Sequence, residues 1–543
     1  MSRGTTRSAR NQRSKLLVTR SISFRMLTTP LRTLALILIL GSIFFWSGCG
    51  DTFRPVVIPN PPTPPDPSNA HTAFAITSNG DFNPGALMLI DVSGDTTSGI
   101  GNAGRGPSHV TLVPPGATRI MVANTLEDSV SSISSSGLQS PATISLPPGS
   151  APVFVHTTQS GVVYVANSGP TPSSPLQPPS VAVINATSNM VTNIIPLTLS
   201  NPVSLAETPD GRKLYVASQS TPGGVTSINT VDRTTIVIPD PSGIINAPIS
   251  VVARSDSARV YVLNQANGNL AVIDSAPDAT LDTLVPGTAV SVGAGADFML
   301  YDSHLNRLYL TNAALGMLAI VNVAQDPPSV LATLSLPAGP TPSCPQGCSS
   351  VAALPNGTGA YVTTLQFGGS TVTPVITVFN PLNNGIVHTI SLPAVAVSSN
   401  CASARYRISS AAAADSSRVY IGNCDAGNIA VLRTSDDMLM LNLPAPVSAA
   451  SPARLNISSA SQSGGQTTYA YALASGQGLQ VGMSIAITPP PGISPGPDEG
   501  SFTISALAPG TFTVLNPSGV SAALNDTGVA TPLQNPVFVL AGP

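Results

Sequence analysis

The chain has 543 residues, with 22 Lys and Arg, 25 Asp and Glu, and a formal net charge of −3. Only 9% of the residues are charged, whereas 53 prolines and 46 glycines interrupt the sequence, which is typical of turn-rich β proteins. Eight basic residues and no acidic ones precede residue 49, so the remainder carries a net charge of −11 and a single lysine, Lys213. Because so acidic a chain offers no counterpart to a phosphate backbone, we expect no nucleic-acid partner.

The N-terminal segment predicts export. A 13-residue apolar run at 34–46 precedes Ser47-Gly48-Cys49. That run is short for a bilayer span, which needs about 20 residues, and fits the apolar region of a signal peptide. The segment resembles a bacterial lipoprotein signal, although Trp46 replaces the usual Leu three positions before the cysteine. The resemblance implies removal of residues 1–48 and lipid attachment at Cys49, and the alternative is an uncleaved anchor.

Two expectations follow for this end of the chain. Met26 would give a signal of conventional length, so we predict that it is the true start. The lipid would hold the protein to the membrane, at the periplasmic face of the outer membrane or at the cell surface. Residues 49–69 follow, with seven prolines between 55 and 67, and such a run favours an extended polyproline stalk of about 3 Å per residue.

A short strand then recurs eight times, as Tyr-Val-Ala-Asn at 164–167 and Tyr-Leu-Thr-Asn at 309–312. The anchor positions are Phe74, Met121, Tyr164, Tyr215, Tyr261, Tyr309, Tyr361 and Tyr420. Successive anchors are 43 to 59 residues apart, close to the roughly 40 to 50 of a four-stranded propeller blade. The sequence therefore predicts an all-β propeller whose tyrosines lie in the blade cores.

Each copy contains further strand signals. A second alternating strand follows every anchor, and a third is visible at 143–146, 333–336 and 389–392, each directly before a proline. Turn sequences such as Pro-Asp-Gly at 209–211 precede several anchors. This pattern resembles the YVTN-repeat β-propellers of bacterial and archaeal surface proteins over about residues 70 to 445. The resemblance implies seven blades, whereas the anchors count eight, so both numbers stay open.

The propeller is expected at 70–458 and a small β-rich domain at 459–543. The first copy lacks a preceding strand of its own, and residues 453–458 would either close the ring or serve as a linker. Alternating segments at 469–473, 483–488, 502–505 and 512–515 indicate the separate β domain.

Four cysteines besides Cys49 predict two disulfides in an exported chain. We favour Cys344 with Cys348 and Cys401 with Cys424. A four-cysteine zinc site is the alternative, but Cys401 and Cys424 are 23 residues apart, far from the spacing of a ligand pair. We therefore expect no metal site.

Catalytic motifs are missing from the sequence. The histidines, His71, His109, His156, His304 and His388, are scattered singly, and we interpret them as surface or loop residues. No phosphate loop, nucleophile elbow or Ser-x-x-Lys motif is present. We therefore expect no cofactor and no catalytic residues.

The expected function is a lipid-anchored envelope propeller that acts as a binding or scaffolding module for an envelope protein or glycan. Its contact loops would be the long inserts at 168–180 and 338–350. One alternative comes from the resemblance of such propellers to lactonases, which implies hydrolysis at the channel mouth by candidates such as Arg254, Arg307, His304 and Asp302. The other is a structural surface component that self-associates.

Overall fold

A computed structural model describes residues 72–542, apart from 115, 117, 137, 139–140, 170–176, 221–222, 277–281, 287–289, 338–347, 402–403, 448–451 and 477. The chain divides into residues 1–63 and residues 64–543. The expected signal, the lipidation site Cys49 and the proline-rich stalk lie outside the described residues. No helix in the described part of the chain is long and apolar enough to cross a membrane.

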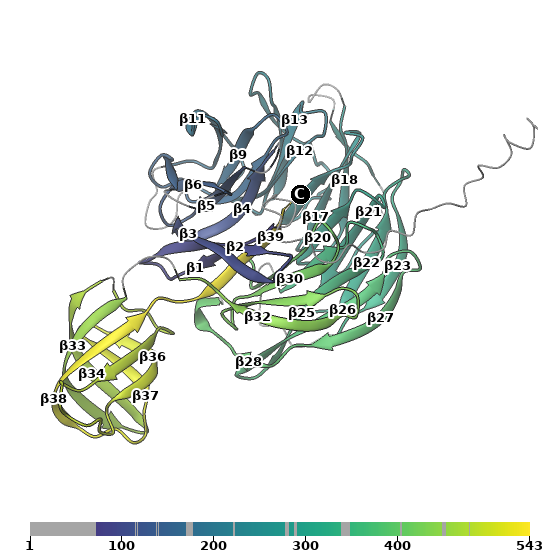
Figure 1. The fold of residues 1–543 in the computed structure, drawn as a ribbon. Coiled ribbons are helices and arrows are strands. Elements are labelled where there is room, and N and C mark those ends of the chain that lie inside the picture. The colour runs from purple at the N-terminus through teal and green to yellow at the C-terminus, as the bar shows by residue number, and fades with distance from the viewer. Residues whose placement is uncertain are drawn as a thin grey trace, which may run out of the picture. The chain divides into compact units, whose positions relative to one another are not determined.

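Eight antiparallel sheets, seven of four strands and one of five, form the blades of a propeller, which confirms the all-β prediction and resolves the blade number as eight. The strands radiate around a common centre in Figure 1. Every repeat anchor lies on the second strand of its blade, counted outward from the centre. The recurring strand motif therefore marks one structural position.

The first four blades, each given from its inner to its outer strand, have the following bounds. Blade 1 is β39 (Asn535–Ala541), β1 (Thr72–Ser78), β2 (Pro84–Asp91) and β3 (Thr96–Arg105). Blade 2 is β4 (Pro107–Val113), β5 (Arg119–Asn124), β6 (Ser129–Ser134) and β7 (Ala142–Ser145). Blade 3 is β8 (Pro152–Thr157), β9 (Val162–Asn167), β10 (Ser180–Asn185) and β11 (Met190–Pro196). Blade 4 is β12 (Pro202–Glu207), β13 (Lys213–Ser218), β14 (Gly224–Asn229) and β15 (Thr235–Val237).

The other four blades follow in chain order. Blade 5 is β16 (Pro248–Ala253), β17 (Arg259–Asn264), β18 (Leu270–Asp274) and β19 (Thr283–Leu284). Blade 6 is β20 (Phe298–Asp302), β21 (Arg307–Asn312), β22 (Met317–Asn322) and β23 (Ser329–Ser335). Blade 7 is β24 (Ser349–Ala353), β25 (Ala360–Gly368), β26 (Thr371–Asn380) and β27 (Gly385–Ser391), with β28 (Val395–Ala396) also paired to β26. Blade 8, after the 3-10 helix η3 (Ser399–Cys401), is β29 (Ile408–Ala412), β30 (Arg418–Asn423), β31 (Asn428–Arg433) and β32 (Met438–Pro444).

The apolar cores lie between neighbouring blades. Tyr215 of blade 4 packs in one cluster with Val262 of blade 5, and Tyr420 of blade 8 packs with Ala73 of blade 1. Both tyrosines are fully buried, as the interpretation of the anchors as core residues requires. Each blade buries its faces only against its neighbours, so closure of the ring completes the last core.

The last strand of the chain closes the ring. Strand β39 pairs with β1, with Phe74 opposite Leu540 and Ala73 opposite Ala541. In Figure 1 the yellow end of the chain lies beside the purple β1 and β2. The inner strand of blade 1 therefore comes from residues 535–541, and segment 453–458, the candidate from the sequence, belongs to a different sheet. Pairing with β39 covers the inner edge of β1, which would otherwise lie unpaired.

A closed six-stranded barrel lies between β32 and β39 in the chain. Its strands are β33 (Ala453–Ser463), β34 (Gln466–Ser475), β35 (Ser484–Thr488), β36 (Gly500–Ala508), β37 (Thr511–Leu515) and β38 (Ala522–Thr531). Alternate residues point inward, and Tyr469 stacks on Phe512 at 5.1 Å inside. The sequence predicts this domain at 459–543, whereas the barrel strands run from 453 to 531 and the chain then returns to the propeller. The barrel is thus inserted between the last strand of blade 8 and the closing strand of blade 1.

Candidate functional site

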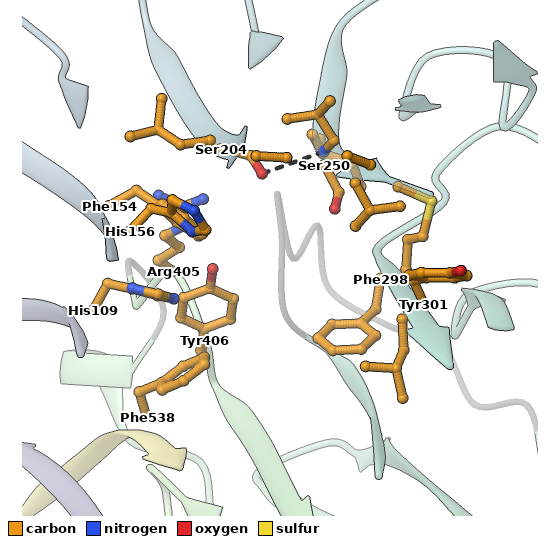
Figure 2. A pocket seen from close by; sticks show the side chains of 18 of the residues that line it. His109, Phe154, His156, Ser204, Ser250, Phe298, Tyr301, Arg405, Tyr406 and Phe538 are labelled. Atoms are coloured by element: carbon orange, nitrogen blue, oxygen red, sulfur yellow. Dashed lines mark hydrogen bonds between the residues drawn. The ribbon is translucent and has the colours of Figure 1, made fainter. Parts of the chain in front are cut away.

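The inner strands surround a cavity of about 440 Å³ in the centre of the propeller. Strands β4, β8, β12, β16, β20 and β39 contribute to its wall, together with Arg405 and Tyr406 just before β29. Figure 2 shows His109, Phe154, His156, Arg405, Tyr406 and Phe538 gathered on one side, with Phe298 and Tyr301 on the other. A cavity of this volume is in the usual range for small-molecule sites.

Stacked rings form the crowded side. The imidazole of His109 stacks on Phe154, with ring centroids 3.9 Å apart and planes inclined by 23°. Phe538 lies 4.7 Å from His109 and meets Tyr406 edge-on at 4.9 Å. Because Phe538 is on β39, closure of the ring also completes this aromatic wall.

Arg405 reaches across the inner ends of two blades. Its Nη1 donates to the carbonyl of Val153 at 3.0 Å, and its Nη2 donates to the carbonyl of Val203. The guanidinium lies 5.4 Å from the ring centre of Phe154 and 5.2 Å from that of Tyr406, a cation–π arrangement. Its Nε is buried without a hydrogen-bond partner, and no carboxylate within the described residues pairs with it.

The segment that carries Arg405 is tied to blade 8. Cys401 and Cys424 form a disulfide, which confirms that predicted pair. Next to this disulfide, Arg407 makes a bidentate ion pair with Asp425, with Nε to Oδ2 at 2.7 Å and Nη2 to Oδ1 at 2.6 Å. Both side chains are almost completely buried. These links fix the backbone on each side of Arg405.

Burial keeps the two cavity histidines neutral. Burial lowers the pKa of His156 to about 4. Burial, and then the charge of Arg405, lower the pKa of His109 well below its usual value. His109 is 8% exposed and its Nδ1 has no hydrogen-bond partner. The interpretation of these histidines as surface or loop residues is therefore wrong for His109, which lies on β4 and faces the channel.

Burial disfavours the charged form of two carboxyl groups on the cavity wall. Burial raises the pKa of Asp297 to about 6, although Asp297 Oδ1 accepts hydrogen bonds from Thr311 Oγ1 at 3.0 Å and Ser349 Oγ at 2.8 Å. Burial, and secondarily the negative charge of Asp210, raise the pKa of Glu207 to about 7. The cavity therefore holds one permanent positive charge and two carboxyls whose charge depends on pH.

The hydrolase candidates from the sequence are not brought together in the cavity. Arg254 donates to Asp326 of the next blade at 3.1 Å, and Arg307 donates to Asn384 of the next blade at 2.9 Å. Asp302 accepts from the backbone of His304 in the same turn, and its other oxygen accepts from Tyr309. Both arginines thus act in contacts between blades.

Two other sequence predictions fall partly outside the described residues. Cys344 is not described, so its pairing with Cys348 stays a prediction. Most of the inserts at 168–180 and 338–350 is not described either. Within the described part of the chain, no group of three or more His, Cys, Asp and Glu side chains has a geometry suited to a metal ion.

Sequence reasoning missed the channel residues. One usable signal was the spacing of each anchor from its inner strand, because Tyr164 pairs directly with His156 and Tyr215 with Ala206. Counting back from each anchor would have placed Phe154 and His156 on one inner strand at alternate positions. No comparable signal marks Arg405, which precedes its blade in an irregular segment.

Comparisons with known proteins support the architecture. No protein-family model and no curated protein matches the chain. Among solved structures, dihydro-heme d1 dehydrogenase NirN in complex with DHE is similar over 71% of this chain and 75% of its own, at 12% identity and a TM-score of 0.50. Apo AztD from Citrobacter koseri is similar over 69% of this chain and 94% of its own, at 14% identity and a TM-score of 0.47.

A third similar structure is Kuenenia stuttgartiensis hydrazine synthase, over 61% of this chain and 96% of its own, at 17% identity and a TM-score of 0.42. At 12% identity, the similarity to the NirN structure shows the fold alone. The fold and the cavity define the chain as an eight-bladed β-propeller with an inserted barrel and an aromatic central site.

Proposed function

We propose that this protein is a lipid-anchored envelope propeller that binds a small ligand in its central channel. The single observation that carries the proposal is the cavity wall, where stacked rings surround an arginine that lacks a carboxylate partner among the described residues. Concave sites with apolar walls and a few directed polar groups are the usual form of small-molecule sites. Such a rigid ring holds its inner side chains in place without a moving lid.

The proposed cellular location rests on the sequence. The apolar run at 34–46, the Ser-Gly-Cys end of the segment and the proline-rich residues after it support a lipid anchor at Cys49. The anchor would keep the propeller at the envelope, where an envelope protein or glycan is the expected partner of the inserts at 168–180 and 338–350. Intact mass measurement of detergent-extracted protein tests the anchor, since the expected species starts at Cys49 and carries a diacylglycerol increment.

The channel site is tested by filling it. Ser250 lies on β16 and faces the cavity in Figure 2, so Ser250→Phe would occupy ligand space. Ser188→Phe, at an exposed turn of blade 3, is the matched control. Small molecules that remain bound to protein purified from native membranes are released by denaturation and identified by mass spectrometry.

We expect a stoichiometric small molecule in the wild type and in Ser188→Phe, and its loss in Ser250→Phe. The same molecule in all three proteins would place binding elsewhere and contradict the proposal. Self-association with no bound small molecule would favour the structural alternative instead.

A further inference from the structure

The charge balance of the cavity sets the class of its ligand, if the proposed function holds. Arg405 donates two hydrogen bonds, both to backbone carbonyls, and these neutralise no charge. Its Nε is buried and has no hydrogen-bond partner among the described residues. A partly buried cation without a counter-ion is unfavourable, so the free Nε edge of this guanidinium suits an anion.

The neighbouring carboxyl groups do not supply that anion. Asp297 uses Oδ1 to accept hydrogen bonds from Thr311 and Ser349, and burial raises its pKa to about 6. Burial raises the pKa of Glu207 to about 7, so this carboxyl is mainly neutral below that pH. Neither forms an ion pair with Arg405, whereas Asp425 is already engaged by Arg407. The positive charge is therefore left for a ligand.

Planar aromatic side chains surround Arg405. Phe154 carries the imidazole of His109 on one face, and the guanidinium lies near the ring centres of Phe154 and Tyr406. Phe538 closes the same group of rings at 4.7 Å from His109. Figure 2 shows this group facing Phe298 and Tyr301 across the cavity. Aromatic walls of this kind favour a flat ring system, which stacks with little loss of contact area.

We infer that the cavity binds a planar aromatic carboxylate, whose carboxylate meets the free edge of Arg405 and whose rings lie against Phe154, Tyr406 and Phe538. The two oxygens of a carboxylate match two parallel guanidinium N–H groups, which gives the pairing a defined direction. His109 Nδ1, buried and without a partner, adds a second polar position on the same side. This inference rests on the proposed function and specifies its ligand class.

The test uses three probes on the full-length protein in detergent, measured by isothermal titration calorimetry. They are 2-naphthoate, its neutral counterpart 2-naphthalenemethanol, and decalin-2-carboxylate, which keeps the charge but lacks planarity. We expect 2-naphthoate to bind at least tenfold more tightly than either of the others. This comparison needs no variant, so it holds even if a substitution impairs folding.

Variants then assign the anion contact. Arg405→Gln should weaken 2-naphthoate at least tenfold and leave the alcohol within about twofold. The matched control is Arg433→Gln, an exposed arginine of the same blade paired with Asp436, which should change neither probe. Phe538→Leu should weaken both naphthalene probes and spare the relative preference for the anion.

The outcomes separate this inference from the proposed function. Equal affinity for the acid and the alcohol, or no binding of any probe, would overturn the ligand class. If, at the same time, protein from native membranes carries a neutral or non-aromatic molecule that Ser250→Phe loses, the channel site stands and only its ligand class is wrong. If neither probes nor native ligand bind, both are wrong.

Discussion

Arg418 of the last blade and Asp95 of the first are joined by an ion pair: Arg418 Nε donates to both carboxylate oxygens, at 3.0 and 2.9 Å. Tyr420, the anchor of blade 8, donates to the same carboxylate at 3.3 Å. Asp95 lies between the third and fourth strands of blade 1, at a left-handed φ of 49°. The second strand of one blade is thus linked to a turn of the next.

The same link between a second strand and a turn of the next blade recurs around the ring, with other pairs of side chains. Its other polar forms are Arg119 with Asn189, Tyr164 with Arg233, Lys213 with Asp282, Arg259 with Asp326, Arg307 with Asn384, and Tyr361 with Asp437. Between blades 1 and 2, where the anchor is Phe74, an apolar contact replaces it, because Phe74 and Leu138 share one cluster. Each blade is therefore linked to the next between its second strand and the turn that joins the neighbour's third and fourth strands.

The first prediction concerns the closing contact. Asp95→Ala leaves a mostly buried guanidinium and a tyrosine hydroxyl unpaired, so we expect a loss of about 3 kcal/mol in the free energy of unfolding. Tyr420→Phe removes one hydrogen bond and should lose about 1 kcal/mol. Urea unfolding measures both. The control, Asp436→Ala, breaks the exposed pair with Arg433 and should leave the stability nearly unchanged. Equal effects of Asp95→Ala and Asp436→Ala would contradict the role of Asp95 in closure.

The blade number was predictable because the anchors are a local signal. Each anchor occupies a buried position on one strand, where a large side chain must fill the space between blades. A large side chain therefore recurs at this position, even where Phe74 or Met121 replaces tyrosine. The disulfide between Cys401 and Cys424 was predictable from the number of cysteines, since an even number in an exported chain leaves few pairings.

The channel was not predictable because its contacts are non-local. Arg405 bonds to Val153, 252 positions earlier, and Phe538 packs on His109 from the far end of the chain. No periodicity links such residues, since their proximity follows from closure of the ring. The closing strand was missed because residues 453–458 alternate as a strand does, and only the pairing shows that residues 535–541 close the ring.

The second prediction is that the barrel is dispensable for the propeller and β39 is not. Asn79 Nδ2 donates to the carbonyls of Pro446 and Leu533, at 3.2 and 2.6 Å. The segment that enters the barrel and the segment that leaves it therefore lie side by side. Replacing residues 448–532 by a short Gly-Ser linker should leave a cooperatively folded propeller by circular dichroism and thermal unfolding. Truncation after residue 534 removes an inner strand and should abolish that transition. An intact transition after truncation would contradict closure by β39.

The third prediction concerns the disulfide. Replacing Cys401 and Cys424 by serine opens a loop of 23 residues, which should lower the free energy of unfolding by about 3 kcal/mol. Urea unfolding with and without reductant measures it, and the variant should be insensitive to reductant at this step. Because Arg405 follows Cys401 closely, the variant should also bind 2-naphthoate more weakly. Unchanged affinity would show that the ion pair of Arg407 with Asp425 holds Arg405 by itself.

The fourth prediction follows from Asp297. Its pKa is raised from 3.8 to about 6, so its contribution to stability is full below pH 3.8 and falls as the pH rises through 6. Asp297→Asn cannot ionise, so its stability relative to the wild type should rise by about 3 kcal/mol between pH 3.5 and pH 7.5. Urea midpoints of both proteins across this range test the difference. A constant difference would show that Asp297 ionises normally despite its burial.

The last prediction is a pH dependence of anion binding set by Glu207. Burial, and secondarily Asp210, raise its pKa to about 7, so the carboxyl is mainly neutral at pH 6 and charged at pH 8. A charged carboxylate on the cavity wall repels an anion, and we expect 2-naphthoate affinity to fall several-fold over this range while that of 2-naphthalenemethanol stays constant. His156, with a pKa of about 4, is neutral throughout, and Asp297 contributes only near pH 6. Glu207→Gln should remove the part of the dependence centred near pH 7, and its persistence in that variant would assign it to another group.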